Sequence, residues 1–311
     1  MKTNYFPTFS ILIETANLSM ADLEGLTECL KTLQNQEYSP VNAREVLLLD
    51  NGSVEPALLN QMGQPYSWLR IQKVSSNMGY HEVKKEGMLR TTGEVVVLAD
   101  SDCRYEPQWL WSLLKPFSEN PEIGIVAGET TVATQNPYGL AMGLVYIFPP
   151  FSYKTILYEA DNYLLNSVAF RRKVLEKCPL PTDLSIYRGN CLIHARQLRE
   201  QGYSIWKQPL ARAIHACPNG IGHFVDRFFK LGSDAWRIQR FLPSGLSKKN
   251  KANVWKLRLF EFRGRFEILF SRNREKMFKL ILALPIAAAA VFFFLTGTAV
   301  AVVKTSLNKH E

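Results

Sequence analysis

A buried strand that ends in two carboxylates constrains this chain more than any other feature of its sequence. Residues 95–99 read Val-Val-Val-Leu-Ala, and Asp100, Ser101 and Asp102 follow directly. An uninterrupted apolar run rich in valine is typical of a strand buried on both faces of a parallel sheet. Side chains two positions apart in an extended chain point to the same side, so Asp100 and Asp102 are expected to face one site. Carboxylate oxygens are the ligands that Mg²⁺ and Mn²⁺ prefer, although acidic residues also end strands simply as turn residues.

Two further apolar runs end in the same way. Residues 9–13 lead into Glu14, and residues 45–49 lead into Asp50. Between them, the leucines of residues 23–33 recur every three or four positions, which predicts a helix with one apolar face. A strand, a helix and a strand in this order predict a parallel right-handed crossover. Because ligands bind beyond the carboxyl ends of parallel strands, we expect the three acidic ends to converge on one polar site.

Several short segments, taken in their order along the chain, resemble the family 2 glycosyltransferases of the GT-A fold. The segments that carry this resemblance are Ile13–Asn17, Asp50–Ser53, Asn77–Gly79 with Lys84, Lys85 and Gly87, Thr92–Asp102, Asn166–Arg172, and Gly202–Trp206 with Pro209 and His215. Each segment is unspecific alone, but their order and spacing over residues 9–223 are typical of that family. The resemblance implies an α/β, Rossmann-like domain whose mostly parallel sheet is flanked by helices. It also implies transfer of a sugar, with inversion, from a UDP- or GDP-sugar.

The resemblance implies a metal site. Asp102 matches the residue of the family's D-x-D motif that ligates Mg²⁺ or Mn²⁺ directly, and Asp100 would contact the ribose, or the metal through water. His215 matches a histidine that reaches the metal or the diphosphate in some related enzymes, and the alternative is an ordinary surface histidine. A nucleoside diphosphate gains negative charge as it leaves the sugar, and a divalent cation at that position stabilises the charge.

The resemblance also implies contacts with the nucleotide sugar. Asp50 falls where the family binds the uracil or ribose edge, and Glu14 and Asn17 lie in its first nucleotide-binding turn. Lys84 or Lys85 could meet the diphosphate as a point charge. A solvated helix face is an equally good interpretation of both lysines.

The general base is where this sequence departs from the family. Inverting members place an E-D pair at the start of a helix, and the corresponding residues here are Asn190 and Cys191. A neutral amide cannot take a proton, and the thiol has no evident activating partner in the sequence. Asp183 is therefore our first candidate for the base, and Glu159 and Asp161 come next. A phosphate acceptor would need little help from a base.

Two alternatives to this enzyme stay open. Without a base, the chain could be a catalytically inactive nucleotide-sugar-binding scaffold or regulator of a membrane polysaccharide assembly. Nucleotidyl transfer on a similar fold is less favoured, because no glycine-rich triphosphate loop follows the first strand.

The sequence also bears on processivity. Processive members of the family carry a Q-x-x-R-W motif, whereas residues 227–240 contain Arg, Trp and Gln in a different order. We therefore expect transfer of one sugar per encounter.

A charge-free stretch near the C-terminus predicts a transmembrane helix. Residues 280–303 contain no charged side chain and are long enough to cross a hydrocarbon layer of about 30 Å. The basic residues that closely precede this stretch are Arg263, Arg265, Arg272, Arg274, Lys276 and Lys279, whereas only Lys304 and Lys309 follow it. This asymmetry favours a single-pass protein of the cell (inner) membrane with its large N-terminal domain in the cytoplasm.

The domain organisation follows from these features. We expect a GT-A domain over residues 1–225, a basic amphipathic membrane-interface region over 226–279, a transmembrane helix over 280–303 and a short tail over 304–311. A helix packed on the catalytic domain is an equally good interpretation of residues 255–270. The net charge of +9 indicates anionic partners, and the adjoining span favours a membrane surface over nucleic acid. The acceptor is then expected to be lipid-linked or a saccharide. The apolar segment 137–158 is interpreted as a core helix rather than a membrane-facing loop.

Overall fold

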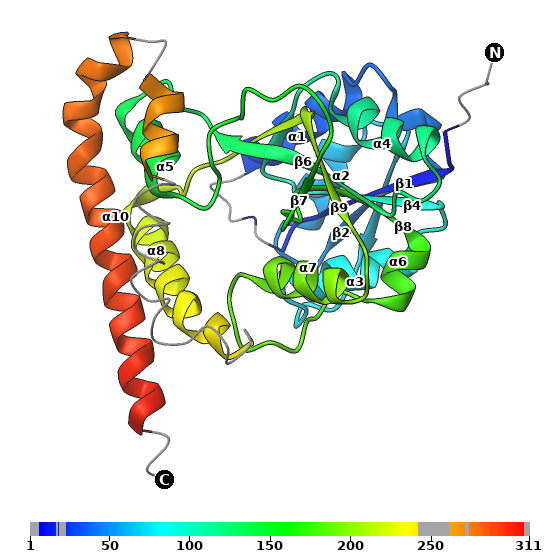
Figure 1. Cartoon of the computed structure of the whole chain (residues 1–311). Helices are drawn as coiled ribbons and strands as arrows, with labels where there is room; N and C mark the ends of the chain where they lie inside the picture. The colour runs from blue at the N-terminus through cyan, green and yellow to red at the C-terminus, as the bar shows by residue number, and fades with distance from the viewer. Residues whose placement is uncertain (1–5, 17, 19–22, 242–261, 271–273, 308–311) are drawn as a thin grey trace. The chain divides into compact units, whose positions relative to one another are not determined.

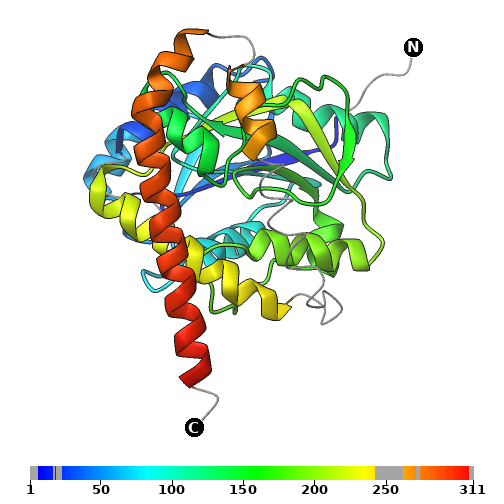
Figure 2. The same cartoon turned by 60° about the vertical axis from the view of Figure 1, so that its left-hand side comes forward.

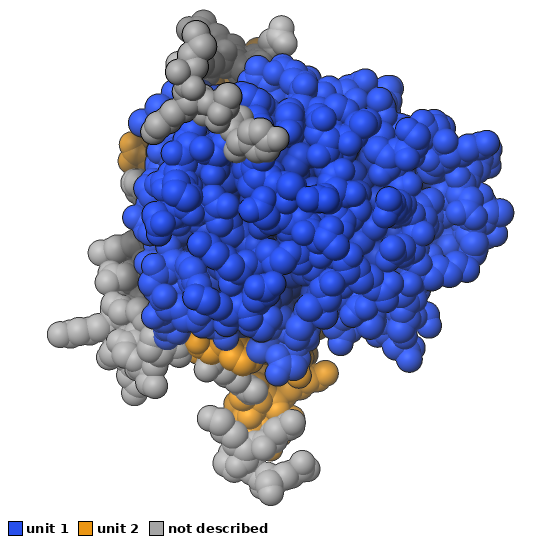
Figure 3. Space-filling model, turned by 90° about the vertical axis from the view of Figure 1, so that its right-hand side faces the viewer, with its two compact units in different colours: residues 1–130, 152–184, 190–215 blue, residues 131–151, 185–189, 216–311 orange. Residues whose placement is uncertain are grey.

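The structure is a computed structural model that describes residues 6–16, 18, 23–241, 262–270 and 274–307. The chain divides into two compact units, which Figure 3 colours separately. Unit 1 comprises residues 1–130, 152–184 and 190–215, and unit 2 comprises residues 131–151, 185–189 and 216–311.

Unit 1 is built on a mixed β-sheet (Figure 1). Over the described residues the sheet has nine strands in the order β3-β2-β1-β4-β8-β6-β9-β5, and β7 pairs with β9. The strands are β1 (Phe9–Glu14), β2 (Val46–Asp50), β3 (Leu69–Lys73), β4 (Val95–Ala99), β5 (Cys103–Tyr105), β6 (Ile125–Val132), β7 (Tyr158–Ala160), β8 (Ser167–Arg171) and β9 (Ile205–His215). Strands β3, β2, β1 and β4 run parallel, whereas β8 is antiparallel to β4 and β6, and β9 is antiparallel to β5 and β7.

Helices cover both faces of this sheet, which explains why the central strands are apolar throughout. The helices of unit 1 are α1 (Leu23–Gln34), α2 (Pro56–Gly63), α3 (Tyr80–Arg90), α4 (Trp109–Glu119), α6 (Arg172–Lys177) and α7 (Asn190–Glu200). Figure 1 shows α3, α6 and α7 on one face of the sheet and α1 and α4 on the other. Side chains of α1, α2 and α4 form a core on one face, and side chains of α3, α6 and α7 form a core on the other. Every residue of β1, β2 and β4 is buried between these cores. The predicted α/β fold is confirmed.

The helix predicted between the first two strands is α1. Its buried residues, Leu26, Cys29, Leu30 and Leu33, recur at three- and four-residue spacing, so one face of the helix packs on the sheet. Burial of each leucine contributes roughly 1.5–3 kcal/mol relative to its exposure. The helix connects β1 to the parallel strand β2, as the sequence predicts.

Apart from the end of β6, the regular secondary structure of unit 2 over the described residues is helical. It contains α5 (Pro137–Val145), α8 (Gly220–Arg237), a 3₁₀ turn (Ile238–Phe241), a helix over residues 262–270 and α10 (Arg274–Leu307). The core-helix interpretation of the segment from residue 137 holds for α5, in which residues 139–144 are buried. In the predicted basic amphipathic region, residues 242–261 and 271–273 lie outside the described part of the chain.

Helix α10 has two different faces. The buried residues Ala283, Ala287, Ala290 and Ala301 share one face, and α5 and α8 pack against the helix. The large apolar side chains exposed on this helix are Met277, Phe278, Ile281, Leu282, Leu284, Val291, Phe292, Leu295, Val303 and Leu307. Figures 1 and 2 show α8 lying beside α10. Among the described residues, Met277–Leu307 is the one helix that is long and apolar enough to cross a membrane.

Candidate active site

The acidic residues that end the parallel strands meet at one edge of the sheet. Glu14 is the last residue of β1 and lies opposite Leu49 of β2, so Asp50 follows one residue further along the same edge. Leu12 of β1 lies opposite Leu98 of β4, so Asp100 comes level with Glu14. The predicted convergence of the three acidic strand ends is confirmed.

Asp100 is held by a buried cation. The Nζ of Lys84 lies 2.7 Å from Oδ1 of Asp100 and also donates to the carbonyl of Ala99 at 2.8 Å. The Lys84 side chain is 0% exposed, so its interpretation as part of a solvated helix face is wrong. The hydroxyl of Tyr80 lies 3.0 and 3.1 Å from the two Asp100 oxygens. Burial alone raises the pKa of Asp100, but Lys84, His215 and Tyr80 outweigh it and hold that pKa below its ordinary value.

A buried tyrosine fixes the backbone of the acidic turn. The hydroxyl of Tyr105 accepts a hydrogen bond from the Asp100 amide at 2.8 Å and lies within donating distance of the carbonyls of Asp100 and Asn166, at 3.2 and 3.1 Å. Burial raises the pKa of Tyr105 well above its ordinary value, so the phenol stays protonated and can donate. The turn that carries Asp102 is thereby anchored at its first residue.

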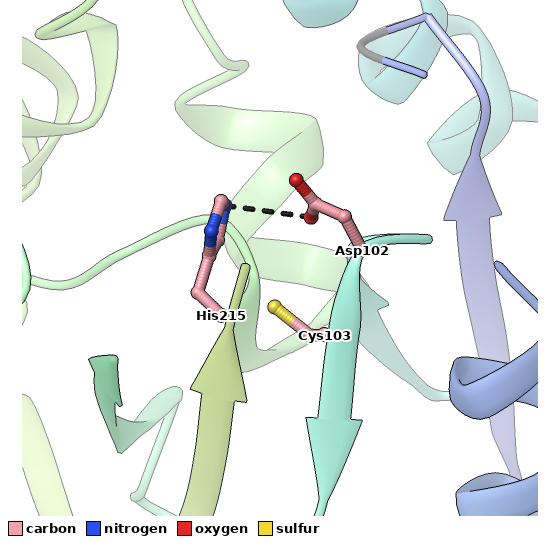
Figure 4. A group of neighbouring side chains, drawn as sticks. All are labelled: Asp102, Cys103 and His215. Carbon is pink, nitrogen blue, oxygen red and sulfur yellow. Dashed lines mark ion pairs between the residues drawn. The ribbon is translucent and has the colours of Figure 1, made fainter. Parts of the chain in front are cut away.

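Asp102 and His215 face one another across two strand ends (Figure 4). Nε2 of His215 lies 3.4 Å from Oδ1 of Asp102, and the side chains are only 9% and 13% exposed. Antiparallel pairing of β5 with β9 brings them together, because Cys103 lies opposite His215 in the register. The interpretation of His215 as an ordinary surface histidine is wrong.

The side chains of Asp102, Cys103 and His215 offer ligand atoms that all lie within 4.8 Å of one another. A carboxylate oxygen and an imidazole nitrogen suit Mn²⁺ or another divalent first-row cation. Burial, reinforced by Asp102 and Asp100, raises the pKa of the Cys103 thiol well above its ordinary value. A soft thiolate suits Zn²⁺ or Cu⁺ rather than Mg²⁺ or Mn²⁺, so Asp102 and His215 fit these harder cations better than the full trio does.

Asp50 lies beside a cavity at the end of β2. Oγ1 of Thr15 donates to Oδ1 of Asp50 at 2.6 Å, which fixes the carboxylate at the cavity wall. The cavity has a volume of about 340 Å³, and its polar lining includes Asn51, Glu55 and Lys73. This volume falls at the lower end of the range of about 300–1,000 Å³ that small-molecule sites occupy.

The candidates for the base lie in different surroundings. Asp183 is exposed in the segment that precedes α7. Asn190, at the start of α7, is buried and donates through Nδ2 to the carbonyl of Pro181 at 2.8 Å.

The other two candidate acids lie beside β7. Glu159 lies opposite Trp206 near the start of β9. Nine residues of extended chain separate that position from His215, which corresponds to roughly 30 Å. Asp161, which follows β7 and forms an exposed ion pair with Arg199, is equally remote. Neither acid is placed to act at the Asp102 site.

The other predicted contacts have mixed outcomes. Glu14 is fully buried at the strand end, and Asn17 lies outside the described residues. Lys84 directs its ammonium at Asp100, so its contact with a diphosphate stays a prediction.

The sequence analysis did not identify Tyr80 and Tyr105 as site residues. Tyr80 stands four residues before Lys84, on the same face of α3, and that spacing was the available signal.

Comparisons with known proteins agree with this geometry. The family model for Glycosyl transferase family 2 matches residues 10–178. A protein of Mycobacterium tuberculosis (strain CDC 1551 / Oshkosh), named only provisionally as a glycosyltransferase, is 34% identical over 77 residues. This match covers 24% of the chain and spans about a fifth (21%) of the relative's length.

Two solved structures share the fold. Mannosyltransferase PcManGT from Pyrobaculum calidifontis, in complex with GDP-Man and Mn²⁺, has a TM-score of 0.60 at 16% identity, over 95% of this chain and 87% of that one. GalNAc-T7, with UDP, GalNAc and Mn²⁺, has a TM-score of 0.54 at 13% identity, over 76% and 50% of the two chains. Because the family model matches more than half of the sequence, the chain belongs to glycosyl transferase family 2, and its fold is of the GT-A type.

Proposed function

We propose that this enzyme transfers a sugar, with inversion, from a UDP- or GDP-sugar to a lipid-linked or saccharide acceptor at the cytoplasmic face of a membrane. The observation that carries the proposal is the single acidic edge of the sheet, which joins the cavity beside Asp50 to the facing pair of Asp102 and His215. PcManGT and GalNAc-T7, which share the fold, have a GDP-sugar or UDP together with Mn²⁺ in their complexes.

Each part of the edge has a distinct role in this proposal. Asp50, held by Thr15, accepts hydrogen bonds from the base or ribose of the nucleotide. Asp102 and His215 hold a Mg²⁺ or Mn²⁺ ion, which when bound supplies positive charge for the diphosphate that leaves. Asp100 stays ionised beside Lys84 and is oriented toward the ribose by Tyr80. Glu14 and Asn17 supply further contacts with the nucleotide.

Membrane attachment rests on the length and apolar composition of Met277–Leu307. A span at residues 280–303 would keep the catalytic domain, proposed as residues 1–225, close to a membrane-bound acceptor. The exposed acid Asp183 is the base that the sequence favours.

Calorimetry with a panel of UDP- and GDP-sugars tests the donor, with and without Mn²⁺, on the full-length protein in detergent. One donor is expected to bind only when Mn²⁺ is present, and the variant Asp102→Ala is expected to lose both the binding and the release of nucleoside diphosphate. Asp226→Ala, which alters an exposed ion pair of α8, serves as the control. Donor turnover that survives in Asp102→Ala would refute the proposal.

A non-catalytic role is the second candidate. It is favoured by the amide at Asn190, where inverting members of the family carry an acid. A protein that binds a donor but never releases nucleoside diphosphate, whatever acceptor is offered, would establish this alternative.

A further inference from the structure

A carboxylate that the sequence did not single out lies on the same edge of the sheet as Asp100. Ala99 of β4 lies opposite Ser167 of β8, and Ala127 of β6 lies opposite Val168 of β8. One residue further along β6, Gly128 comes level with Ala99, so Glu129 comes level with Asp100. The two acids are separated by two strand spacings, which corresponds to about 10 Å between their Cα atoms.

Glu129 and Asp100 also project from the same face of the sheet. Ala127 and Leu98, each two residues earlier in its strand, both belong to the core formed with α3 and α7. Because side chains alternate along a strand, Glu129 and Asp100 follow them onto that face. Asp50 lies on the other flank of Asp100, two strands away in the opposite direction. A donor that runs from Asp50 across the ends of β1 and β4 would therefore point toward β6, the strand that carries Glu129.

The carboxylate of Glu129 is fixed by hydrogen bonds. The amide of Ser152 donates to Oε2 at 2.9 Å, and the hydroxyl of Ser152 donates to Oε1 at 2.5 Å. The side chain is half-buried, so it is neither a core residue nor a freely moving surface acid. A carboxylate has about four lone-pair positions, and these two bonds leave room to accept a proton from a third partner.

A half-buried lysine supports this position. Nζ of Lys207 donates to the carbonyl of Gly128, immediately before Glu129, at 3.2 Å. Burial lowers the pKa of Lys207 to about 8, although the Glu129 carboxylate opposes that change. Among the described residues, Tyr158 of β7 and Cys191 of α7 also face this cluster, and the ammonium of Lys154 lies 3.4 Å from the centre of the Tyr158 ring. Cys191 stands at the start of α7, where inverting relatives carry their acid.

We propose that Glu129 is the general base of this enzyme and that its acceptor is a hydroxyl group rather than a phosphate. The proton of the acceptor O–H passes to a Glu129 oxygen while the acceptor oxygen bonds to the anomeric carbon. The bond from that carbon to the diphosphate breaks, and the nucleoside diphosphate leaves with the electron pair. The inference rests on the proposed function and replaces Asp183 in the role of base.

The test compares Glu129→Gln with two matched variants in the full-length protein. Glu122→Gln changes an exposed acid just before the same strand, and Asp183→Asn removes the rival base. Nucleoside diphosphate release is measured with Mn²⁺ and the bound donor, with a saccharide, a polyprenyl phosphate or water alone as acceptor. Donor affinity is measured separately by calorimetry.

Glu129→Gln is expected to keep the donor Kd within about twofold and to lower the release rate about 10²–10⁴-fold, the usual contribution of a general base. The fall of the rate toward acid pH should disappear in this variant, while Glu129→Asp should recover part of the rate. Glu122→Gln, the matched control, should behave like the wild type, and the rate of Asp183→Asn decides between the two candidate bases.

Three results would overturn the inference. The first is full release by Glu129→Gln, and the second is a comparable loss in Asp183→Asn alone. The third is transfer to polyprenyl phosphate that does not depend on Glu129. In all three the wild type still turns over its donor, so the proposed function stands. A wild type that binds its donor but never releases nucleoside diphosphate overturns both.

Discussion

Replacement of Lys84 by methionine tests the buried ion pair on which the acidic edge depends. Methionine preserves most of the length and apolar contact of the lysine stem but removes the ammonium that lies 2.7 Å from Asp100. The side chains of the pair are 0% and 6% exposed, so water cannot replace the lost partner. Removing one partner of such a pair costs about 3–5 kcal/mol, because the other charge is left buried. At roughly 2–4 °C per kcal/mol, this corresponds to a fall in Tm of about 6–20 °C.

The sign of the pH dependence follows from the pKa of Asp100. In the wild type this pKa is lowered, so the carboxylate contributes stability above its unfolded pKa of about 3.9, and that stability is lost as pH falls through the lower folded value. In Lys84→Met, burial is no longer opposed by the ammonium, and the pKa of Asp100 should rise above the unfolded value. The variant is then least stable, relative to the wild type, at neutral pH, and the gap narrows as pH falls toward about 4.

The assay is thermal unfolding of the full-length protein in detergent, without added metal, from pH 4.5 to 8. Lys85→Met is the matched control, because Lys85 lies next to Lys84 in the chain but is only half-buried. The double variant Lys84→Met with Asp100→Asn should recover much of the loss, since it removes the unpaired charge. A Tm within about 2 °C of the wild type at pH 7, or a difference that stays constant across the pH range, would refute this account of the pair.

Three further outcomes are expected. Mn²⁺ should raise the Tm of the wild type but not of Asp102→Asn, in a titration followed by unfolding, because only a cation bound to the folded state stabilises it. Thr15→Val removes the 2.6 Å hydrogen bond to Asp50 and should weaken donor binding about tenfold, or roughly 1.4 kcal/mol, by calorimetry. Gly93→Ala would place a Cβ 2.5 Å from the backbone of β1 and should cost about 1–3 kcal/mol of unfolding free energy or more, whereas Gly222→Ala, with open space around it, should not destabilise.

The sequence predicts the acidic edge of the sheet well, because its signals are local. An apolar run that stops at an acid identifies both a buried strand and its carboxyl end, and this is how Glu14, Asp50 and Asp100 were located. Lys84 lies in a predicted helix, but whether it faces water or Asp100 depends on how that helix packs on the sheet. No local pattern distinguishes these two orientations.

Long-range pairing decides the rest of the site. Asp102 meets His215 only because β5 pairs with β9. The sequence carries no local signal for the register of that pairing. Glu129 reaches the edge through two successive antiparallel pairings, of β4 with β8 and of β8 with β6. A single acid within an apolar strand resembles any solvent-facing residue, so the sequence directed attention to the loop acid Asp183 instead.

The two faces of α10 determine how much of this apolar helix can contact lipid. Gly232 of α8 and Gly297 of α10 allow close backbone contact, since an added Cβ at either would lie 1.9 Å from a carbonyl oxygen of the partner helix. Thr298 strengthens this contact by donating to the carbonyl of Gly232 at 2.9 Å. Helix α8 also carries the exposed ion pair of Asp226 and Lys230, which hydrocarbon would not tolerate. Lipid contact is therefore expected on the outward, large-residue face of α10 alone. Substitutions there should change partitioning into membranes, whereas substitutions on the small-residue face should change the folding of unit 2.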